Sequence, residues 1–479
     1  MITINASVLR FFLSLFLGGC VMGCTAPQLL HPSEKVTLPD RYDTQTDTVN
    51  MAEWPRHTFF SDTLLVNLID EAVANNFDAR MAWQRIEQAK ASVLFAKGLL
   101  APAVYAGGGA AVRRYGLYTM DGAGNATTDI EPGKIVPVNL PDFLVGLQSS
   151  WEADITGKLR NRKKAASARL LASVEGRHWL VSHIVSEVAA AYYELLSLDR
   201  ELDIIRSTIQ LQENALAVVT AQKENGSANE LVVNQFTAQV LNTKALEYDV
   251  RQAITETENR LNVLLGRVPR PIGRNAATFE TALADSLLAG VPAALLRNRP
   301  DIRQAELEVI ASKADVRAAR AAFYPSLNIT ASVGFQSYAT RLLFSSPESF
   351  VFTLVGGLYA PLVNRSAIKA EFQAANAYQT QALYHYQKTT VTAYAEVYNE
   401  LTRMTNLGRA LQYKEQEAEA LTRAIDVAND LYLTGRATYL EVLMTQQNAL
   451  DARLDWVVSR REQFINAIQL YKVLGGGWK

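Results

Sequence analysis

The stretch "LLRNRPDIRQAELEVIASKADVRAARAAFYPSLNITASVGFQS", from Leu295 to Ser337, joins a charged helical segment directly to a segment with the two-residue period of a β-strand. In "SLNITASVGFQ" apolar and polar side chains alternate, with Leu327, Ile329, Ala331, Val333 and Phe335 against Asn328, Thr330, Ser332, Gly334 and Gln336. Because successive side chains of a strand point to opposite faces, this strand has one apolar face and one polar face.

The segment 143–153, "FLVGLQSSWEA", shows the same alternation, and two further strands are expected at about 103–113 and 350–360. Segments of about ten residues with this pattern are typical of membrane β-barrels, with lipid on one side and a polar lumen on the other. A soluble sheet with one face on a core is the alternative. Four strands cannot close a barrel, and an open edge in lipid is costly, so membrane-embedded strands require several chains to complete one barrel.

The absence of proline indicates where the long helices lie. All 15 prolines lie outside residues 142–268 and 362–479. These two windows predict long helices at about 158–224 and 366–434, each followed by a shorter one at about 228–266 and 437–474. The first window carries a heptad seam typical of helices packed side by side, at Ile184, Val188, Ala191, Leu195, Leu198, Leu202, Ile205 and Ile209.

The two windows also match each other at an offset of 209 residues, which pairs Gly226 with Gly435 and Leu261 with Leu470. The segments before the windows match at an offset of 223, and the first copy carries about 14 extra residues around 113–140. The sequence therefore predicts two copies of one plan: a helix, two strands, a long helix, a glycine-containing turn and a shorter helix.

The N-terminus, "MITINASVLRFFLSLFLGGCVMGC", has a positive residue, Arg10, before a short apolar core. This pattern is typical of a secretory signal, and the ending Leu17–Cys20 resembles a bacterial lipobox, in which the cysteine after the cleavage site is lipidated. Cys20 is the expected lipid acceptor and Cys24 the alternative. An ordinary signal with incidental cysteines remains a further alternative.

Composition argues against several classes of protein. The 47 Lys and Arg residues balance 48 Asp and Glu residues, so no nucleic-acid partner is expected. His178 and His183 lack the HExxH spacing, and no G-x-S-x-G elbow or phosphate-binding loop occurs. We therefore expect no enzymatic activity, no metal site and no cofactor other than the lipid on the N-terminal cysteine.

Three segments, "LLRNRPDIRQAE", "ARAAFYPSLNITASVG" and "LYKVLGGGW", resemble the outer membrane factor family, the TolC-type exit ducts of Gram-negative efflux systems. The lipobox points to its NodT-like lipoprotein branch, which works with efflux pumps of the RND type. The resemblance spans nearly the whole chain, and Arg299–Arg303 followed by Ala305-Glu306 is a specific match.

The resemblance implies a mainly α-helical protein with membrane β-structure. Three chains would build a 12-stranded outer membrane β-barrel, four strands from each, continuous with a long periplasmic α-helical barrel. The implied function is a passive exit duct of a tripartite efflux system, opened at its periplasmic tip by a periplasmic adaptor and an inner membrane pump. The expected organisation is a signal peptide at 1–19, an extended tether at 20–60, repeat 1 at 61–269, an equatorial segment at 270–295 and repeat 2 at 296–479, the second repeat placing its strands at about 326–336 and 350–360.

The periplasmic tip, near the turns at Gly226 and Gly435, is where the family constricts and where adaptors dock. The resemblance places Glu441 toward the pore, where three copies would form a ring of carboxylates that attracts cations. The alternative is that Glu441 is an ordinary solvent-exposed residue of a helix, with no role in the pore. Tyr432 and Arg436 are placed to hydrogen-bond to a neighbouring tip, at Asn229 or Glu230.

The tip also departs from the family pattern. Met444 stands where an aspartate is common, and Val232 stands where some members carry an acidic residue. The closed state is therefore expected to depend more on apolar contacts, at Leu440 and Met444, than on ion pairs. The rival to the whole interpretation is a structural or adhesion lipoprotein, a helical stalk without a lumen, which predicts apolar residues on both faces of the strands.

Overall fold

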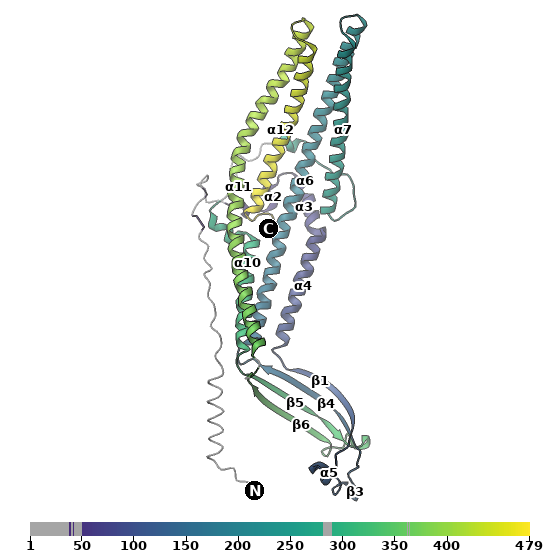
Figure 1. Ribbon diagram of the computed structural model, residues 1–479, viewed down its shortest axis with the longest axis vertical. Coiled ribbons are helices and arrows are strands. Elements are labelled where there is room, and N and C mark those ends of the chain that lie inside the picture. The colour runs from purple at the N-terminus through teal and green to yellow at the C-terminus, as the bar shows by residue number, and fades with distance from the viewer. Residues whose placement is uncertain (1–37, 40–41, 43–49, 281–289, 362, 364) are drawn as a thin grey trace. The chain divides into compact units, whose positions relative to one another are not determined.

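The computed structural model describes residues 38–39, 42, 50–280, 290–361, 363 and 365–479 (Figure 1). They fall into two compact units that are discontinuous in sequence. Unit 1 contains Gln88–Leu170 and Leu307–Leu383, and unit 2 contains the described parts of Glu34–Glu87, Leu171–Glu306 and Tyr384–Lys479. Both units therefore draw on both halves of the sequence, and neither follows the expected boundary between repeats.

Unit 1 contains a four-stranded antiparallel sheet in the order β1-β4-β5-β6. Each strand overlaps an expected one, and the bounds differ from the expected ones by three residues or fewer: β1 Ala103–Arg113, β4 Leu140–Ala153, β5 Ser326–Ser337 and β6 Phe350–Tyr359. Apolar and polar residues alternate in the central strands β4 and β5, as the two-residue period predicts, whereas the edge strands β1 and β6 show little alternation.

The extra residues of the first half, between β1 and β4, form elements that the sequence analysis did not anticipate. A short helix α5, Met120–Asn125, precedes a small hairpin of β2, Asp129–Glu131, and β3, Lys134–Ile135. Arg341, in the short 3-10 helix η3 between β5 and β6 (Thr340–Leu342), forms an ion pair with Glu131.

Four long helices form the two proline-free windows. They are α6 Lys158–Glu224, α7 Glu230–Leu264, α11 Ser366–Leu433 and α12 Tyr439–Val473. The helices α6 and α7 form one antiparallel hairpin and α11 and α12 the other (Figure 1). Ion pairs link the members of each hairpin, such as Arg206 to Glu247 at 3.1 Å and Lys414 to Asp455 at 3.0 Å.

The turns at the two hairpin tips have the same backbone hydrogen bonds at the 209-residue offset. The amide of Gly226 donates to the carbonyl of Lys223 at 2.9 Å, and the amide of Gly435 donates to the carbonyl of Tyr432 at 3.0 Å. Both glycines have positive φ, +76° and +70°, which residues with a Cβ atom rarely adopt. Each turn therefore depends on its glycine.

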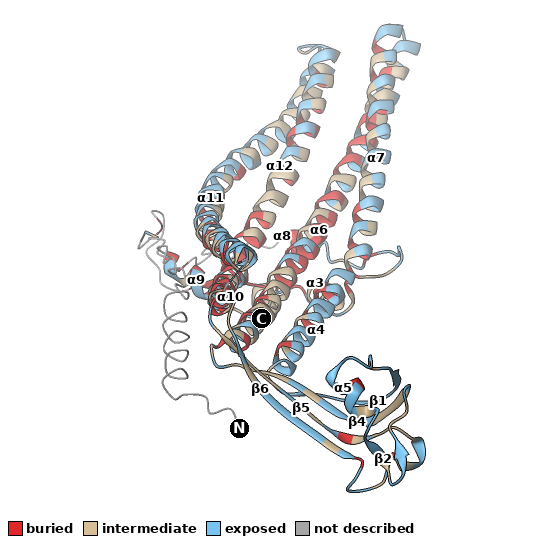
Figure 2. Cartoon of the chain, turned by 60° about the horizontal axis from the view of Figure 1, so that its bottom comes forward, coloured by how far each residue is buried: buried red, intermediate tan, exposed pale blue. Residues whose placement is uncertain are grey.

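The main hydrophobic core lies in unit 2, where the heptad seam of α6 is buried, except for the half-buried Leu202 (Figure 2). The helix α3, Thr63–Asn75, packs into this core, as do residues from the N-terminal segment that we expected to be an extended tether. Tyr42, Met51 and Phe60 are buried, and Phe59 stacks on Tyr471 at 4.1 Å. The tether prediction is therefore wrong for residues 50–60, because this segment carries the large apolar side chains that the core needs.

Two helices that we expected to be continuous are broken. The expected helix of the first half is divided at Asn76 into α3 and α4, Phe77–Gly98, because Asn76 has ψ of 133° and its side-chain oxygen accepts from the amides of Asp78 and Ala79. In the second half the break at Arg299 separates α9, Leu295–Asn298, from α10, Pro300–Ala321. The proline at 300 cannot donate a hydrogen bond to the preceding turn.

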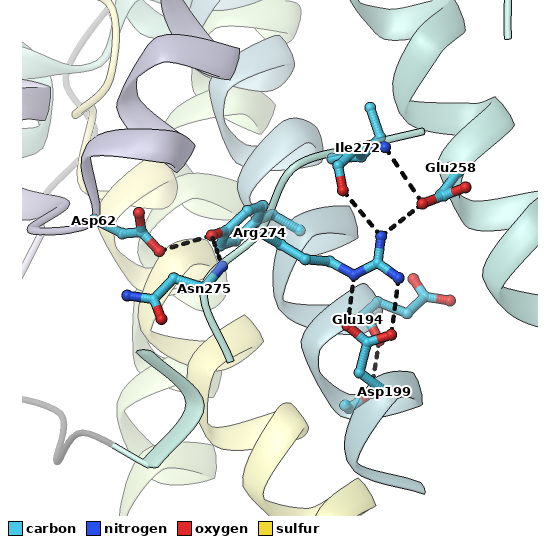
Figure 3. A network of polar contacts seen from close by, with 9 residues as sticks. Asp62, Glu194, Asp199, Glu258, Ile272, Arg274 and Asn275 are labelled. Carbon is cyan, nitrogen blue, oxygen red and sulfur yellow. Dashed lines mark hydrogen bonds and ion pairs between the residues drawn. The ribbon is translucent and has the colours of Figure 1, made fainter. Parts of the chain in front are cut away.

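The described part of the inter-repeat segment is held to the helices of unit 2 by polar contacts (Figure 3). Arg274 forms a bidentate ion pair with Asp199 of α6 and a second ion pair with Glu258 of α7, the latter at 2.6 Å. The remaining elements of this unit are short: η1 Met51–Glu53, α2 Arg56–Phe59, α8 Ala277–Glu280 and η2 Pro292–Ala294. Among the described residues, no helix has both the length and the apolar character that crossing a membrane would require.

Candidate functional site

The register of the sheet continues each face across all four strands. Val333 of β5 pairs with Leu147 of β4 and with Phe352 of β6, so apolar residues lie opposite apolar residues. On the other face, Ser332 pairs with Gln148 and with Thr353. Residues paired directly across strands point to the same side, so the alternation read in single strands becomes one apolar face and one mainly polar face.

Most residues of the four strands are exposed or half-buried (Figure 2). Many large side chains on the apolar face are exposed, from 42% at Val333 to 75% at Phe352, including Val104, Val112, Leu147, Leu354 and Leu358, while Trp151, Ile329 and Phe335 are half-buried. A face of this kind in water would normally be covered by a helix or a second sheet. The exposure therefore indicates an apolar environment or a partner on this side of the sheet.

The second face is less uniform than the sequence suggested. Polar side chains occupy it in β4 and β5, including Gln148, Ser150, Glu152, Asn328 and Thr330. In β6 the same face carries Val351, Val355 and Tyr359 beside Thr353. The alternation is therefore strong in the two central strands and weak at one edge.

Both edge strands, β1 and β6, pair on one side only within the described chain. On its outer side each leaves the backbone amide and carbonyl groups of about every second residue without a strand partner, along 11 residues of β1 and 10 residues of β6. Such edges are templates for pairing with another strand.

The second candidate region is the tip of the hairpins. Glu441 lies at the third position of α12, and its carboxylate accepts hydrogen bonds from the backbone amide of Thr438 at 2.6 Å and from its hydroxyl at 2.9 Å. The amide of Glu441 in turn donates to the Thr438 hydroxyl, which completes a capping box. These hydrogen bonds lower the pKa of Glu441, so the carboxylate is charged and fixed in place.

The sequence analysis missed this role for Glu441, although the Thr438–Glu441 segment, "TYLE", has the S/T-x-x-E spacing that predicts a capping box. Asn229 has the corresponding position in the first hairpin and caps α7 by accepting from the amide of Val232 at 3.1 Å. Glu230 forms an ion pair with Lys223 across its own turn.

Tyr432 makes a contact that the sequence analysis did not identify. Its hydroxyl donates to the side-chain oxygen of Gln222 at 2.7 Å, which links α11 to α6. This hydrogen bond goes to neither Asn229 nor Glu230, whose side chains bond within their own turn. Arg436 is exposed. Contacts of Tyr432 and Arg436 with another chain stay a prediction.

The expected apolar gate residues are exposed, Leu440 at 50% and Met444 at 56%. They lie one turn apart on α12, and therefore on one side of the helix. The described residues leave about half of each side chain exposed, so both are available for contact with another copy or a partner. Cys20 and Cys24, the expected lipid acceptors, lie outside the described residues.

Comparisons with known proteins match this arrangement. Residues 68–267 and 291–476 match the family model described as outer membrane efflux protein. The "Cation efflux system protein CusC" of Escherichia coli O6:H1 is 27% identical, with the alignment covering 98% of this chain and 99% of that protein. The "Pyoverdine export outer membrane protein OpmQ" of Pseudomonas putida is 30% identical, covering 88% of this chain and 87% of that protein. A solved structure of CusC is 25% identical with a TM-score of 0.81, covering 95% of this chain and all of that one.

Proposed function

The chain belongs to the outer membrane efflux protein family, and from this membership we infer that it is the outer membrane channel component of a tripartite efflux system. It is located in the outer membrane and extends into the periplasm, as its relatives do. The relatives are transport proteins, and an exit duct of this kind needs no catalytic residues. The finer points below are our proposals.

The exposed apolar face of the sheet is the observation that carries the proposal. Its register sets Leu147, Val333 and Phe352 side by side, and all three are exposed. A lipid environment satisfies this face, while Gln148, Ser332 and Thr353 on the other face suit a water-filled lumen. A helical stalk without a lumen, the rival interpretation, gives no reason for a polar face on the same strands.

We propose that three chains form one barrel. The edges β1 and β6 cannot remain unpaired in lipid, where each unsatisfied backbone group costs several kcal/mol. Pairing β6 of one chain with β1 of the next removes every open edge, and four strands from each of three chains give the 12-stranded barrel that the family resemblance implies. The helices would continue as the periplasmic α-helical barrel, and the two halves of the sequence as two structural repeats.

We propose that the hairpin tips form the gate. Three copies of Glu441, each held by its own Thr438, would place three charged carboxylates around the threefold axis. The exposed Leu440 and Met444 would pack against their counterparts in the closed state, with Arg436 and Tyr432 beside the neighbouring tip. A periplasmic adaptor would replace these contacts and open the duct, with energy from an inner membrane pump of the RND type.

Two further proposals concern the N-terminus and the cargo. A lipid on Cys20, or on Cys24 as the alternative, would anchor the mature chain to the outer membrane, and no other cofactor is proposed. The names of the relatives refer to different cargoes, cations for CusC and pyoverdine for OpmQ. This variety fits a passive duct, because the cargo would be selected by the pump.

Conductance of the purified protein in a planar lipid bilayer tests the proposed function. We expect a pore with a preference for cations, and Glu441→Gln should lower that preference, because glutamine keeps the capping hydrogen bonds but removes the charge. Asp455→Asn is the matched control, since it removes an exposed carboxylate from α12 away from the tip and should leave the preference unchanged. Absence of any pore contradicts the duct, whereas a pore unaffected by Glu441→Gln contradicts only the carboxylate ring.

A further inference from the structure

A small cavity lies near the hairpin tips, with walls from all four long helices. Its volume is about 240 Å³. Its aliphatic and phenylalanine lining residues are Leu211, Ala215, Val218 and Val219 of α6, Phe236 of α7, Leu433 of α11 and Val442 of α12. A benzene ring fills an apolar cavity of about 150 Å³, so this space holds a ring with a short substituent.

The cavity also contains a polar group without a partner. Gln446 of α12 lines it and is only 2% exposed, yet its side-chain oxygen makes no hydrogen bond within the described chain. Gln212 lies three residues before Ala215, another lining residue, and its amide group is also buried and unpaired. A buried amide without a partner is unfavourable, so the site gains from a molecule that can hydrogen-bond to it.

The charge of the lining restricts what such a molecule can be. None of the residues that line the cavity is acidic or basic. The site is open on one side, because Leu211, Val218 and Leu433 are partly exposed, but an ion would still lose part of its hydration there without an opposite charge to compensate. The chemistry favours a neutral molecule, with an apolar body and one hydroxyl or amide group.

We propose that this cavity is a binding site for a small neutral amphiphile, such as an alkylphenol, whose polar group hydrogen-bonds to Gln446. The ring would lie between the α6–α7 hairpin and the α11–α12 hairpin. Tyr432 also lines the cavity while its hydroxyl bonds to Gln222, so the ligand would contact a residue that links the two hairpins. The inference goes beyond the proposed function, since a duct does not require this site.

Equilibrium dialysis of 4-ethylphenol against the full-length protein in detergent, with protein-free micelles as the reference, tests the proposal. We expect saturable binding of one molecule per chain, and at least tenfold weaker binding of 4-ethylbenzoate because of its charge. Ala215→Phe, which fills the cavity, should weaken binding at least tenfold. Ala217→Phe places the same side chain on an exposed position of α6 and should leave binding unchanged.

A second variant tests the role of the amide. Gln446→Leu keeps the volume of the side chain, so it should weaken 4-ethylphenol binding about three- to tenfold, the worth of one hydrogen bond, and leave ethylbenzene binding intact. Equal effects on both ligands would overturn the role of Gln446. No saturable binding, or binding that Ala215→Phe does not change, would overturn the site itself and indicate a water-filled space or a surface for a protein partner. Neither result depends on whether the protein conducts ions.

Discussion

Arg299 is the largest fully buried side chain in the part of the chain that the structure describes. Its guanidinium donates to both oxygens of Asp301, at 3.0 and 2.7 Å, and to Glu396 of α11 at 2.7 Å. It also donates to the carbonyl of Val473, the last residue of α12, and lies over the ring of Trp179 in α6. One side chain therefore joins the break between α9 and α10 to three long helices.

Arg299→Leu should lower the free energy of unfolding by about 1–3 kcal/mol, because it leaves the carbonyl of Val473 and the partly buried carboxylate of Asp301 without their partner. Arg297 is the matched control, since it is two residues away and pairs with Glu53 on the exposed surface. Arg297→Leu should cost less than about 1 kcal/mol. Denaturant unfolding followed by circular dichroism measures both, and equal costs would show that Arg299 does not join the helices.

Asp62 provides a pH-dependent test at the same scale. Burial alone would raise the pKa of its carboxyl, but hydrogen bonds from Tyr192, Thr278 and the amide of Leu64 outweigh burial and lower the pKa below its ordinary value. The folded chain therefore releases this proton more readily than the unfolded chain does. The resulting stabilisation is complete above about pH 4, the ordinary value, and is lost as the pH falls through the folded-state pKa.

Asp62→Asn should therefore destabilise the protein near neutral pH by about 1.5–3 kcal/mol, the worth of hydrogen bonds to a charged group. The difference from the wild-type protein should shrink as the pH falls below about 4. Thermal unfolding at a series of pH values measures it, with Asp426→Asn as the control for removing an exposed carboxylate. A difference that stays constant down to low pH would contradict the charged state of Asp62 in the folded protein.

Single residues also show which contacts the sequence alone can predict and which it cannot. The spacing from Thr438 to Glu441 holds enough information to predict the capping box, because the contact is local. The hydrogen bond from Tyr432 to Gln222 joins residues 210 positions apart and depends on how one hairpin lies against the other. No local pattern encodes that relation, so residue types alone do not predict it.

At the scale of helices and strands, the hairpin tips depend on backbone conformation more than on packing. A Cβ atom added at Gly435 would meet no neighbouring atom within 4 Å, so only its φ of +70° opposes substitution. Gly435→Ala should therefore cost about 1–2 kcal/mol, the penalty of a left-handed residue with a side chain.

The same substitution at Gly408 should have the opposite effect on stability. Gly408 lies within α11, has helical rather than left-handed backbone, and also has open space around its Cα. Gly408→Ala should stabilise the protein by about 0.5–1 kcal/mol, because alanine loses less conformational entropy in a helix. Thermal unfolding distinguishes the two, and destabilisation by both would show that packing, not φ, decides these positions.

The long elements were predictable because their signals are long. Proline excludes a helix interior, so two windows of more than a hundred residues without proline nearly define α6, α7, α11 and α12. The break at Asn76 was missed because "ANNFDAR" contains neither glycine nor proline and continues the helical pattern. Only the capping of the next helix by Asn76 shows that the backbone turns there.

At the scale of the whole molecule, one chain leaves its sheet incomplete. The apolar face, the two open edges and the exposed residues at the tip are all surfaces that the chain itself does not cover. The sequence indicated such surfaces through the alternation in β4 and β5, since a soluble core for that face was missing. It could not give the register between chains, because that depends on backbone pairing across an interface.

Pairing of β6 with β1 of a neighbouring chain makes a prediction about which positions meet. Neighbouring strands alternate in direction across the sheet, so β6 and β1 would be antiparallel and would close a ring of three chains. Thr353 lies on the polar face of β6, in the same row as Tyr105 of β1, and residues of one face recur at every second position. Closing a barrel staggers the register by an amount that one chain does not fix, so Thr353→Cys should form a disulfide with a cysteine at one of the odd positions from 103 to 113 of the next chain, but at none of the even positions between them.

Because each chain carries both cysteines, closure links three chains covalently, and non-reducing electrophoresis should show a band at three times the chain mass. If Cys20 carries the lipid, as proposed, a Cys24→Ser background leaves no other free thiol to compete. The informative result is whether the cross-linked positions of β1 are odd or even. Random collisions between chains would cross-link positions on both faces of the strand. Cross-links at 106 and 108 would mean that Thr353 of one chain lies on the same side as the apolar face of β1 in the next chain. The polar faces of the chains could then not line one lumen. If no cross-link forms and the protein sediments as a single chain, the proposal of a closed three-chain barrel is contradicted. The unpaired edges of the sheet would then need another explanation.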